Sequence, residues 1–159
     1  NLNPNSAQGD KIFIDLLKSM GCSVKKGKDW VEVKGAQLKP ITVNMEDYPD
    51  IVIPLAVTAA FAKGTSKFTS IGHLKYKESD RLSSTIKELN KIGIKAFDKD
   101  STLIVEGGIP NGAKINTYND HRIAMSFAIA GLKVKGITIK NPRVVNKSFP
   151  DFWEKFGAL

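Results

Sequence analysis

The sequence IVIPLAVTAAFA at residues 51–62 decides the fold class, because it is apolar on almost every side of a helix. This pattern predicts a buried helix, and Pro54 falls within the first turn, where proline is tolerated. The sequence HRIAMSFAIAGL at residues 121–132 predicts a second buried helix. Ile51 and Ile123 hold the same place in the two segments and are 72 residues apart. The fold is therefore expected to repeat itself.

Hydrophobic periodicity around these helices predicts a regular alternation of helices and strands. An amphipathic helix is expected on each side of the first buried helix, at residues 11–20 and 80–92. The predicted strands of the first copy lie at residues 22–26, 30–33, 39–43 and 67–71. Those of the second copy lie at 94–97, 103–106, 114–116 and 136–140, and a last helix is expected at 147–156.

Other residue pairs also match at the same offset of 72 residues. They are Met20-Gly21 with Ile92-Gly93, Val33 with Val105, and Gly64 with Gly136. So many matches at one offset indicate two similar folding units, each with two helices and about four strands. The prediction is an α/β lobe built from a duplicated unit, with no internal domain boundary.

Composition excludes several classes of protein. The 159 residues carry a formal net charge of +8, and 42% of them are hydrophobic, which is typical of a globular chain. The single cysteine, Cys22, excludes an intrachain disulfide and favours a reducing compartment. The longest apolar run, residues 51–62, is too short for a membrane span, which needs about 20 residues.

Charged residues gather in the four loops that lead into predicted helices. Helix N-termini attract anions, and added arginine and lysine side chains strengthen such sites. A repeated unit tends to present these loops on one side of the lobe. The loops are residues 48–50 (YPD), 73–81 (HLKYKESDR), 118–122 (YNDHR) and 146–151 (NKSFPD).

Most of these residues also have an ordinary structural interpretation. Asp50 and Asp120 suit helix N-caps, and Glu78 and Arg81 are spaced for a surface ion pair. His73 and His121 are interpreted as structural histidines. Arg122 is different, because it directly precedes an almost wholly apolar helix and needs an anionic partner there. Either Asp120 or a ligand is expected to provide it.

Metal and nucleotide chemistry have little support in the sequence. Two distant histidines and one cysteine form no zinc-spaced cluster, and no Walker or dinucleotide glycine pattern is present. A basic module that binds nucleic acid or a protein partner is the rival hypothesis, because of the net charge. The basic residues alternate with acidic ones, which favours compact anions that need acid–base chemistry.

The four helix-start loops resemble the 5-enolpyruvylshikimate-3-phosphate synthase family, in its order and at its spacing. The resemblance implies a two-lobed fold in which each lobe holds three βαβαββ units. The chain matches the later part of the C-terminal lobe, with units at about 6–77 and 78–147 and a terminal helix at 148–157. The related enolpyruvyl transferase of UDP-N-acetylglucosamine is the alternative within this fold.

The resemblance also implies a reaction and roles for particular residues. The family transfers the enolpyruvyl group of phosphoenolpyruvate to the 5-hydroxyl of shikimate 3-phosphate and releases phosphate, without a metal or other cofactor. Asp50 is expected to accept the hydroxyl proton and Glu78 to protonate the methylene carbon. Arg81, Arg122 and Lys147 are expected to hold phosphoenolpyruvate. Asp50, His73 and Lys77 are expected to contact shikimate 3-phosphate.

Two alternatives remain for the proton donor. Lys77 and Arg81 flank Glu78 and favour its ionised form, whereas a general acid needs a raised pKa. Either burial on lobe closure outweighs these cations, or Lys147 shares the role.

The resemblance implies an N-terminal lobe as partner, a monomeric whole enzyme and a cytoplasmic location. Neither nucleic acid nor a membrane is an expected partner. The 159 residues alone are expected to fold marginally at best and to be inactive.

Overall fold

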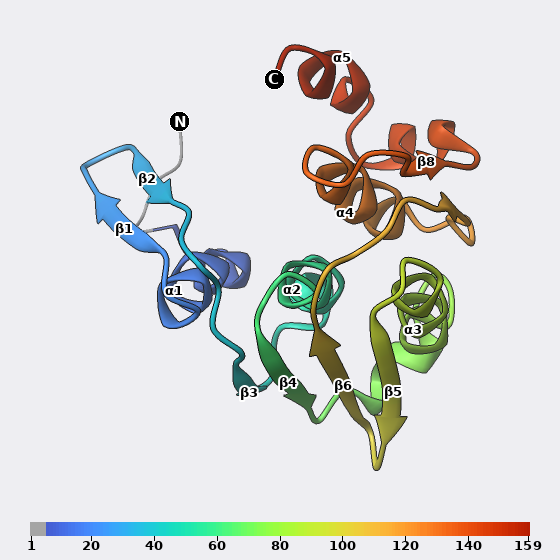
Figure 1. Cartoon of the computed structure of the whole chain (residues 1–159). Helices are drawn as coiled ribbons and strands as arrows, with labels where there is room; N and C mark the ends of the chain where they lie inside the picture. Colours follow the sequence, from blue (N-terminus) through green and yellow to red (C-terminus); the bar gives the residue numbers. More distant parts are fainter. Residues whose placement is uncertain (1–5) are drawn as a thin grey trace.

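The computed structural model describes residues 6–159 and confirms the predicted α/β class (Figure 1). The α-helices are α1 (Ile12–Ser19), α2 (Val52–Ala59), α3 (Arg81–Lys91), α4 (His121–Gly131) and α5 (Phe152–Gly157). Short 3-10 turns are η1 (Gly9–Lys11), η2 (Pro49–Ile51), η3 (Gly72–Tyr76) and η4 (Pro142–Lys147). The strands are β1 (Ser23–Lys26), β2 (Val31–Lys34), β3 (Thr42–Asn44), β4 (Gly64–Thr69), β5 (Lys95–Lys99), β6 (Thr102–Gly107), β7 (Lys114–Ile115) and β8 (Thr138–Ile139).

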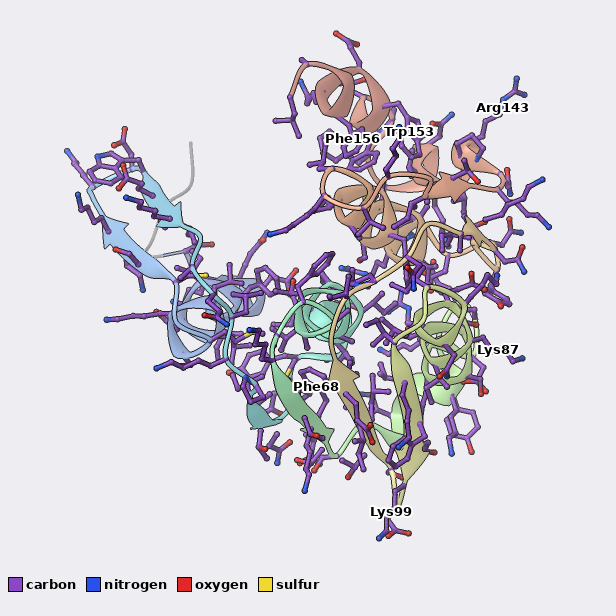
Figure 2. The ribbon with its side chains drawn as sticks, in the orientation of Figure 1. Phe68, Lys87, Lys99, Arg143, Trp153 and Phe156 are labelled. Atoms are coloured by element: carbon purple, nitrogen blue, oxygen red, sulfur yellow. The ribbon has the colours of Figure 1, made fainter. Side chains whose placement is uncertain are left out.

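A four-stranded sheet in the order β3-β4-β6-β5 lies at the centre. Strands β3 and β4 are parallel and joined through α2, whereas β6 runs antiparallel to both β4 and β5. With α3 between β4 and β5, the segment from β3 to β6 has complete βαβαββ connectivity. Figure 1 shows α3 beside β5 and the tight β5–β6 hairpin, whose tip carries Lys99 in Figure 2.

The same elements flank this sheet on both sides at the 72-residue offset. The antiparallel β1–β2 hairpin follows α1, as the β5–β6 hairpin follows α3. The parallel strands β7 and β8 are joined through α4, as β3 and β4 are joined through α2. Gly21 and Gly93 end equivalent helices with φ of 103° and 82°, a left-handed conformation that glycine adopts without a steric penalty. The predicted unit boundaries at 77 and 147 stay a prediction.

The core surrounds α2, which packs on the central sheet and on α4. All three large side chains Ile53, Leu55 and Phe127 are fully buried, and α2 packs directly on α4. The sequence prediction of two buried helices is therefore confirmed. Both begin beside the charged loops, so the packing of α2 on α4 also sets the distance between those loops.

Several predicted element boundaries are wrong by a few residues. The strand expected from residue 39 begins at Thr42, because Pro40 has no N–H to donate. The helix expected from residue 147 begins at Phe152, after the 3-10 turn η4. There Phe152, Trp153 and Phe156 form a small aromatic cluster against α4. Trp153 and Phe156 are labelled in Figure 2. Among residues 6–159, no helix is long and apolar enough to cross a membrane.

The glycine pair gives a test of the repeat. Gly93→Ala is expected to destabilise the chain by about 1–2 kcal/mol, because an L-residue at φ 82° is strained and its new methyl group meets Asn111 Nδ2 at 2.7 Å. The matched control is Gly108→Ala, whose new methyl group meets only Ile94 Cδ1 at 3.9 Å. Urea unfolding measures both variants, and equal losses of stability would contradict the left-handed connection.

Candidate anion-binding site

The four charged loops meet at the starts of three helices. Asp50 lies in η2 just before α2, Arg81 is the first residue of α3, and Arg122 is the second residue of α4. Lys147, at the end of η4, reaches the same cluster from the C-terminal side. An aspartate N-cap fixes the start of α3 and another fixes the start of α4. Asp80 accepts from the Ser83 N–H at 2.9 Å, and Asp120 accepts from the Arg122 N–H at 2.9 Å.

Arg81 is the buried centre of the cluster, with a side chain only 3% exposed. Its Nε donates to Asp120 Oδ2 at 2.7 Å, and its Nη1 donates to Asp50 Oδ1 at 2.8 Å. Burial alone lowers the pKa of Arg81, but the bonds and charges of Asp120 and Asp50 outweigh it and raise the pKa. The guanidinium therefore stays charged and fixed in direction.

Arg122 takes its anionic partner from the equivalent position of the first repeat. Its Nη2 donates to Asp50 Oδ2 at 2.9 Å, and its Nη1 donates to the Asp50 carbonyl at 3.1 Å. Asp120, the side-chain partner considered from the sequence, instead pairs with Arg81. Asp50 therefore bridges both arginines, and its side chain remains 42% exposed.

Glu78 forms the second half of the cluster. Lys147 Nζ donates to Glu78 Oε1 at 2.8 Å, and this bond is the main reason that the pKa of Glu78 is lowered. Burial acts in the opposite direction, whereas the charges of His121, Lys147 and Arg81 lower the pKa further. His121 Nδ1 lies 3.2 Å from Glu78 Oε2 but makes no hydrogen bond within the described chain.

The structure gives no contact that joins His73 or Lys77 to this cluster. His73 lies in η3 with a buried Nε2 that has no hydrogen-bond partner among residues 6–159. Lys77 is exposed and forms no ion pair within the same range. The structure thus joins five of the predicted site residues by hydrogen bonds and ion pairs: Asp50, Glu78, Arg81, Arg122 and Lys147. It gives no such contact from His73 or Lys77 to them among residues 6–159.

The sequence predicts only local roles for two further residues of the cluster, Asp120 and His121. Asp120 is fully buried and holds Arg81 as well as capping α4. His121 faces Glu78 rather than only filling space. The N-cap pattern located Asp120, but no sequence signal pointed to its partner 39 residues earlier.

The charges of the cluster favour an anion over a metal. Donor atoms of Glu78, Asp120 and His121 lie within 4.8 Å of one another, which is a possible metal geometry. However, Asp120 is paired with Arg81 and Glu78 with Lys147, so a cation would be repelled by two resident cations. Arg81, Arg122 and Lys147 instead provide N–H donors of the kind that anion oxygens accept from.

Comparison with known proteins gives one consistent result. A family model described as EPSP synthase (3-phosphoshikimate 1-carboxyvinyltransferase) matches residues 1–156. The 3-phosphoshikimate 1-carboxyvinyltransferase of Syntrophobacter fumaroxidans is 44% identical over 161 residues, which cover 99% of this chain and 38% of the relative. That of Methanoregula boonei is 44% identical over 154 residues, covering 96% of this chain and 37% of the relative. The chain thus spans well under half the length of these relatives.

Solved structures show the same relation. EPSP synthase from Acinetobacter baumannii has a TM-score of 0.81 at 32% identity, covering 95% of this chain and 38% of that chain. The enolpyruvyl transferase NikO from Streptomyces tendae has a TM-score of 0.74 at 24% identity, covering 91% of this chain and 34% of that chain, and this match shows the fold alone.

The Lys147–Glu78 pair predicts a measurable pKa change. Lys147→Gln should raise the pKa of Glu78 towards its ordinary value of 4.5, since the largest cause of the lowered pKa is removed. The titration is followed through the ¹³C signal of the Glu78 carboxyl group, with Lys99→Gln at the β5–β6 tip as the control.

The pH dependence of folding stability should follow from the lowered pKa of Glu78. A lowered pKa in the folded state contributes stability that is present above about pH 4.5 and is lost as the pH falls through the folded-state pKa. Lys147→Gln should reduce this acid-dependent part, whereas Lys99→Gln should not. An unchanged Glu78 titration in Lys147→Gln would contradict the ion pair.

Proposed function

Because the chain belongs to the EPSP synthase family, we propose that it contributes one half of an active site that transfers the enolpyruvyl group of phosphoenolpyruvate. The acceptor is the 5-hydroxyl of shikimate 3-phosphate, and inorganic phosphate is released. One observation carries the proposal: Arg81 and Arg122 converge on one carboxylate, Asp50, beside the Glu78–Lys147 pair. Cations and proton-transferring carboxylates are the groups that this reaction needs.

Arg81, Arg122 and Lys147 hold the carboxylate and phosphate of phosphoenolpyruvate. Each has an acidic partner in this structure, and those of Arg122 and Lys147 are themselves partly exposed. The substrate therefore competes with Asp50 for the two guanidinium groups. Arginine suits this exchange because it binds planar carboxylates and phosphates through paired N–H groups.

Asp50 accepts the proton of the attacking 5-hydroxyl group while the oxygen of that hydroxyl group bonds to the substituted carbon of phosphoenolpyruvate. A second group gives a proton to the methylene carbon, and the methyl group so formed then returns one proton to that second group as inorganic phosphate leaves. Lys147 lowers the pKa of Glu78, so the Glu78 carboxyl group is ionised at neutral pH and has no proton to give in this arrangement. This favours a shared role, in which the Lys147 ammonium group, hydrogen-bonded to Glu78, gives the proton to the methylene carbon and is left as a neutral amine.

Shikimate 3-phosphate is assigned to Asp50, His73 and Lys77 through the family resemblance. Lys77 precedes Glu78 and is exposed, which leaves its ammonium group available for a phosphate. No metal or cofactor enters this proposal, since lysine and arginine supply the charge for both anionic substrates.

The partner proposed for this chain is the remainder of a two-lobed enzyme. A cavity of about 810 Å³ opens among α1, α2 and α4, and Ile129 on its wall is 55% exposed. An apolar surface of this kind suits contact with further protein. The opposite lobe would complete both substrate sites, so the chain alone is expected to be inactive. A monomeric whole enzyme in the cytoplasm belongs to the same proposal.

A chimera tests the activity directly. The chain replaces the aligned 161 residues of the Syntrophobacter fumaroxidans relative, and phosphate release from the two substrates is measured. The chimera should be active, the 159 residues alone should be inactive, and Asp50→Asn should lower kcat of the chimera by about 100-fold or more. A folded but inactive chimera would refute the proposed function.

The same substitution should have the opposite effect on binding. Asp50→Asn removes the carboxylate that competes for Arg81 and Arg122, so the affinity for phosphoenolpyruvate should rise, by about threefold to tenfold. Titration calorimetry on the chimera measures this, with Asp98→Asn near η3 as a remote control. Weaker binding in Asp50→Asn would contradict the competition.

A further inference from the structure

Glu88 is a buried carboxylate outside the cluster described above. It lies in α3 with 0% exposure, and three donors surround it. Tyr118 Oη donates to Oε1 at 2.7 Å, while Lys91 Nζ and the Asn116 N–H donate to Oε2 at 2.5 and 3.1 Å. Burial of a charged group costs free energy even when it is well paired. Its presence in the core therefore needs a reason other than packing.

The internal repeat shows that packing alone does not require a carboxylate here. The equivalent position 72 residues earlier is Leu16, which is also buried, in α1. A leucine thus fills the same place in the first repeat. Glu88 differs from it by offering acceptors to the loop before α4.

That loop has an unusual backbone. Tyr118 and Asn119 both adopt left-handed conformations, with φ of 51° and 60°. Their equivalents in the first repeat, Glu46 and Asp47, do not. Left-handed residues other than glycine are strained and persist only where other contacts hold them. The Tyr118–Glu88 hydrogen bond is such a contact.

The strained turn leads directly to the buried ion pair of the anion-binding site. Asp120 N donates to Thr117 O at 2.8 Å, which closes the turn, and Asp120 Oδ2 then accepts from Arg81 Nε. The position equivalent to Asp120 in the first repeat is Tyr48, which cannot pair with an arginine in this way. The three differences between the repeats, at 88, 118 and 120, thus form one connected path to Arg81.

We propose that Glu88 and Tyr118 are positioning residues that hold the turn at 118–119 so that Asp120 meets Arg81. The identity of the anion rests on the proposed function, but the positioning itself does not. Burial and Glu88 raise the pKa of Tyr118 to about 12, so its hydroxyl stays protonated as a donor across the physiological pH range.

The double variant Glu88→Leu/Tyr118→Phe tests this inference. It removes the Tyr118–Glu88 hydrogen bond from both sides, and Leu is the residue that the first repeat already uses. The Asn116 N–H and Lys91 Nζ lose their Glu88 acceptor, so the thermal midpoint should fall by a few degrees while the variant stays folded. The Arg81 Nε–H NMR signal should be protected from solvent exchange in the parent chain and lose protection in the variant. In the chimera, KM for phosphoenolpyruvate should rise about fivefold, with a smaller change in kcat.

Two single variants complete the design. Tyr118→Phe removes only one hydroxyl group and should act in the same direction, which decides the question if the double variant fails to fold. Tyr76→Phe makes the same chemical change at a side chain that is 89% exposed and should have no effect.

A folded variant with a protected Arg81 signal and an unchanged KM would overturn the inference. A protected parent signal that is lost in the variants, together with an inactive chimera, would instead refute the proposed function and keep the positioning role.

Discussion

The buried ion pair between Arg81 and Asp120 is the interaction on which the site depends. Both side chains are almost completely buried, and their atoms approach to 2.7 Å. Removing Arg81 leaves the Asp120 carboxylate without a cation in the interior, which costs about 3–5 kcal/mol. Because Arg81 begins α3 and Asp120 precedes α4, the pair also fixes the two helix starts against each other.

Asp50 extends this pair to a third helix start and to the protein surface. It bonds to both Arg81 and Arg122, and Arg122 stands 72 residues after it, at the equivalent position of the second repeat. Duplication therefore explains why an acid and a base face each other across α2 and α4, whose packing fixes their separation. The repeat builds the frame, and differences between its two copies supply the chemistry.

The sequence predicts the arrangement of helices and charged loops better than it predicts the contacts between side chains. The two buried helices, the 72-residue period and the charged helix starts all follow from apolar spacing and local turn chemistry. The strand that begins at Thr42 is predicted from residue 39, although Pro40, which has no N–H to donate, marks its limit in the sequence. The helix predicted at residues 147–156 begins only at Phe152, because a turn at residues 148–151 that contains Pro150 separates it from η4.

Pairings between distant segments are the part that sequence reasoning could not provide. Arg122 was expected to contact either Asp120, two residues away, or a ligand, but it pairs with Asp50. Glu88 lies on the amphipathic helix predicted at residues 80–92, and only the fold brings the Tyr118 hydroxyl to its carboxylate. Such contacts depend on how the helices pack, and no local pattern in the sequence indicates that packing.

The most direct measurement of this account is a double-mutant cycle between Arg81 and Asp120. Arg81→Met removes the charge, whereas Asp120→Asn keeps an oxygen that can still cap α4. Urea unfolding of the chimera with the parent sequence, with each single substitution and with both gives the coupling free energy. A coupling of about 2 kcal/mol or more is expected for a buried pair at 2.7 Å. Losses of stability that add to within about 0.5 kcal/mol would contradict the pair's central role.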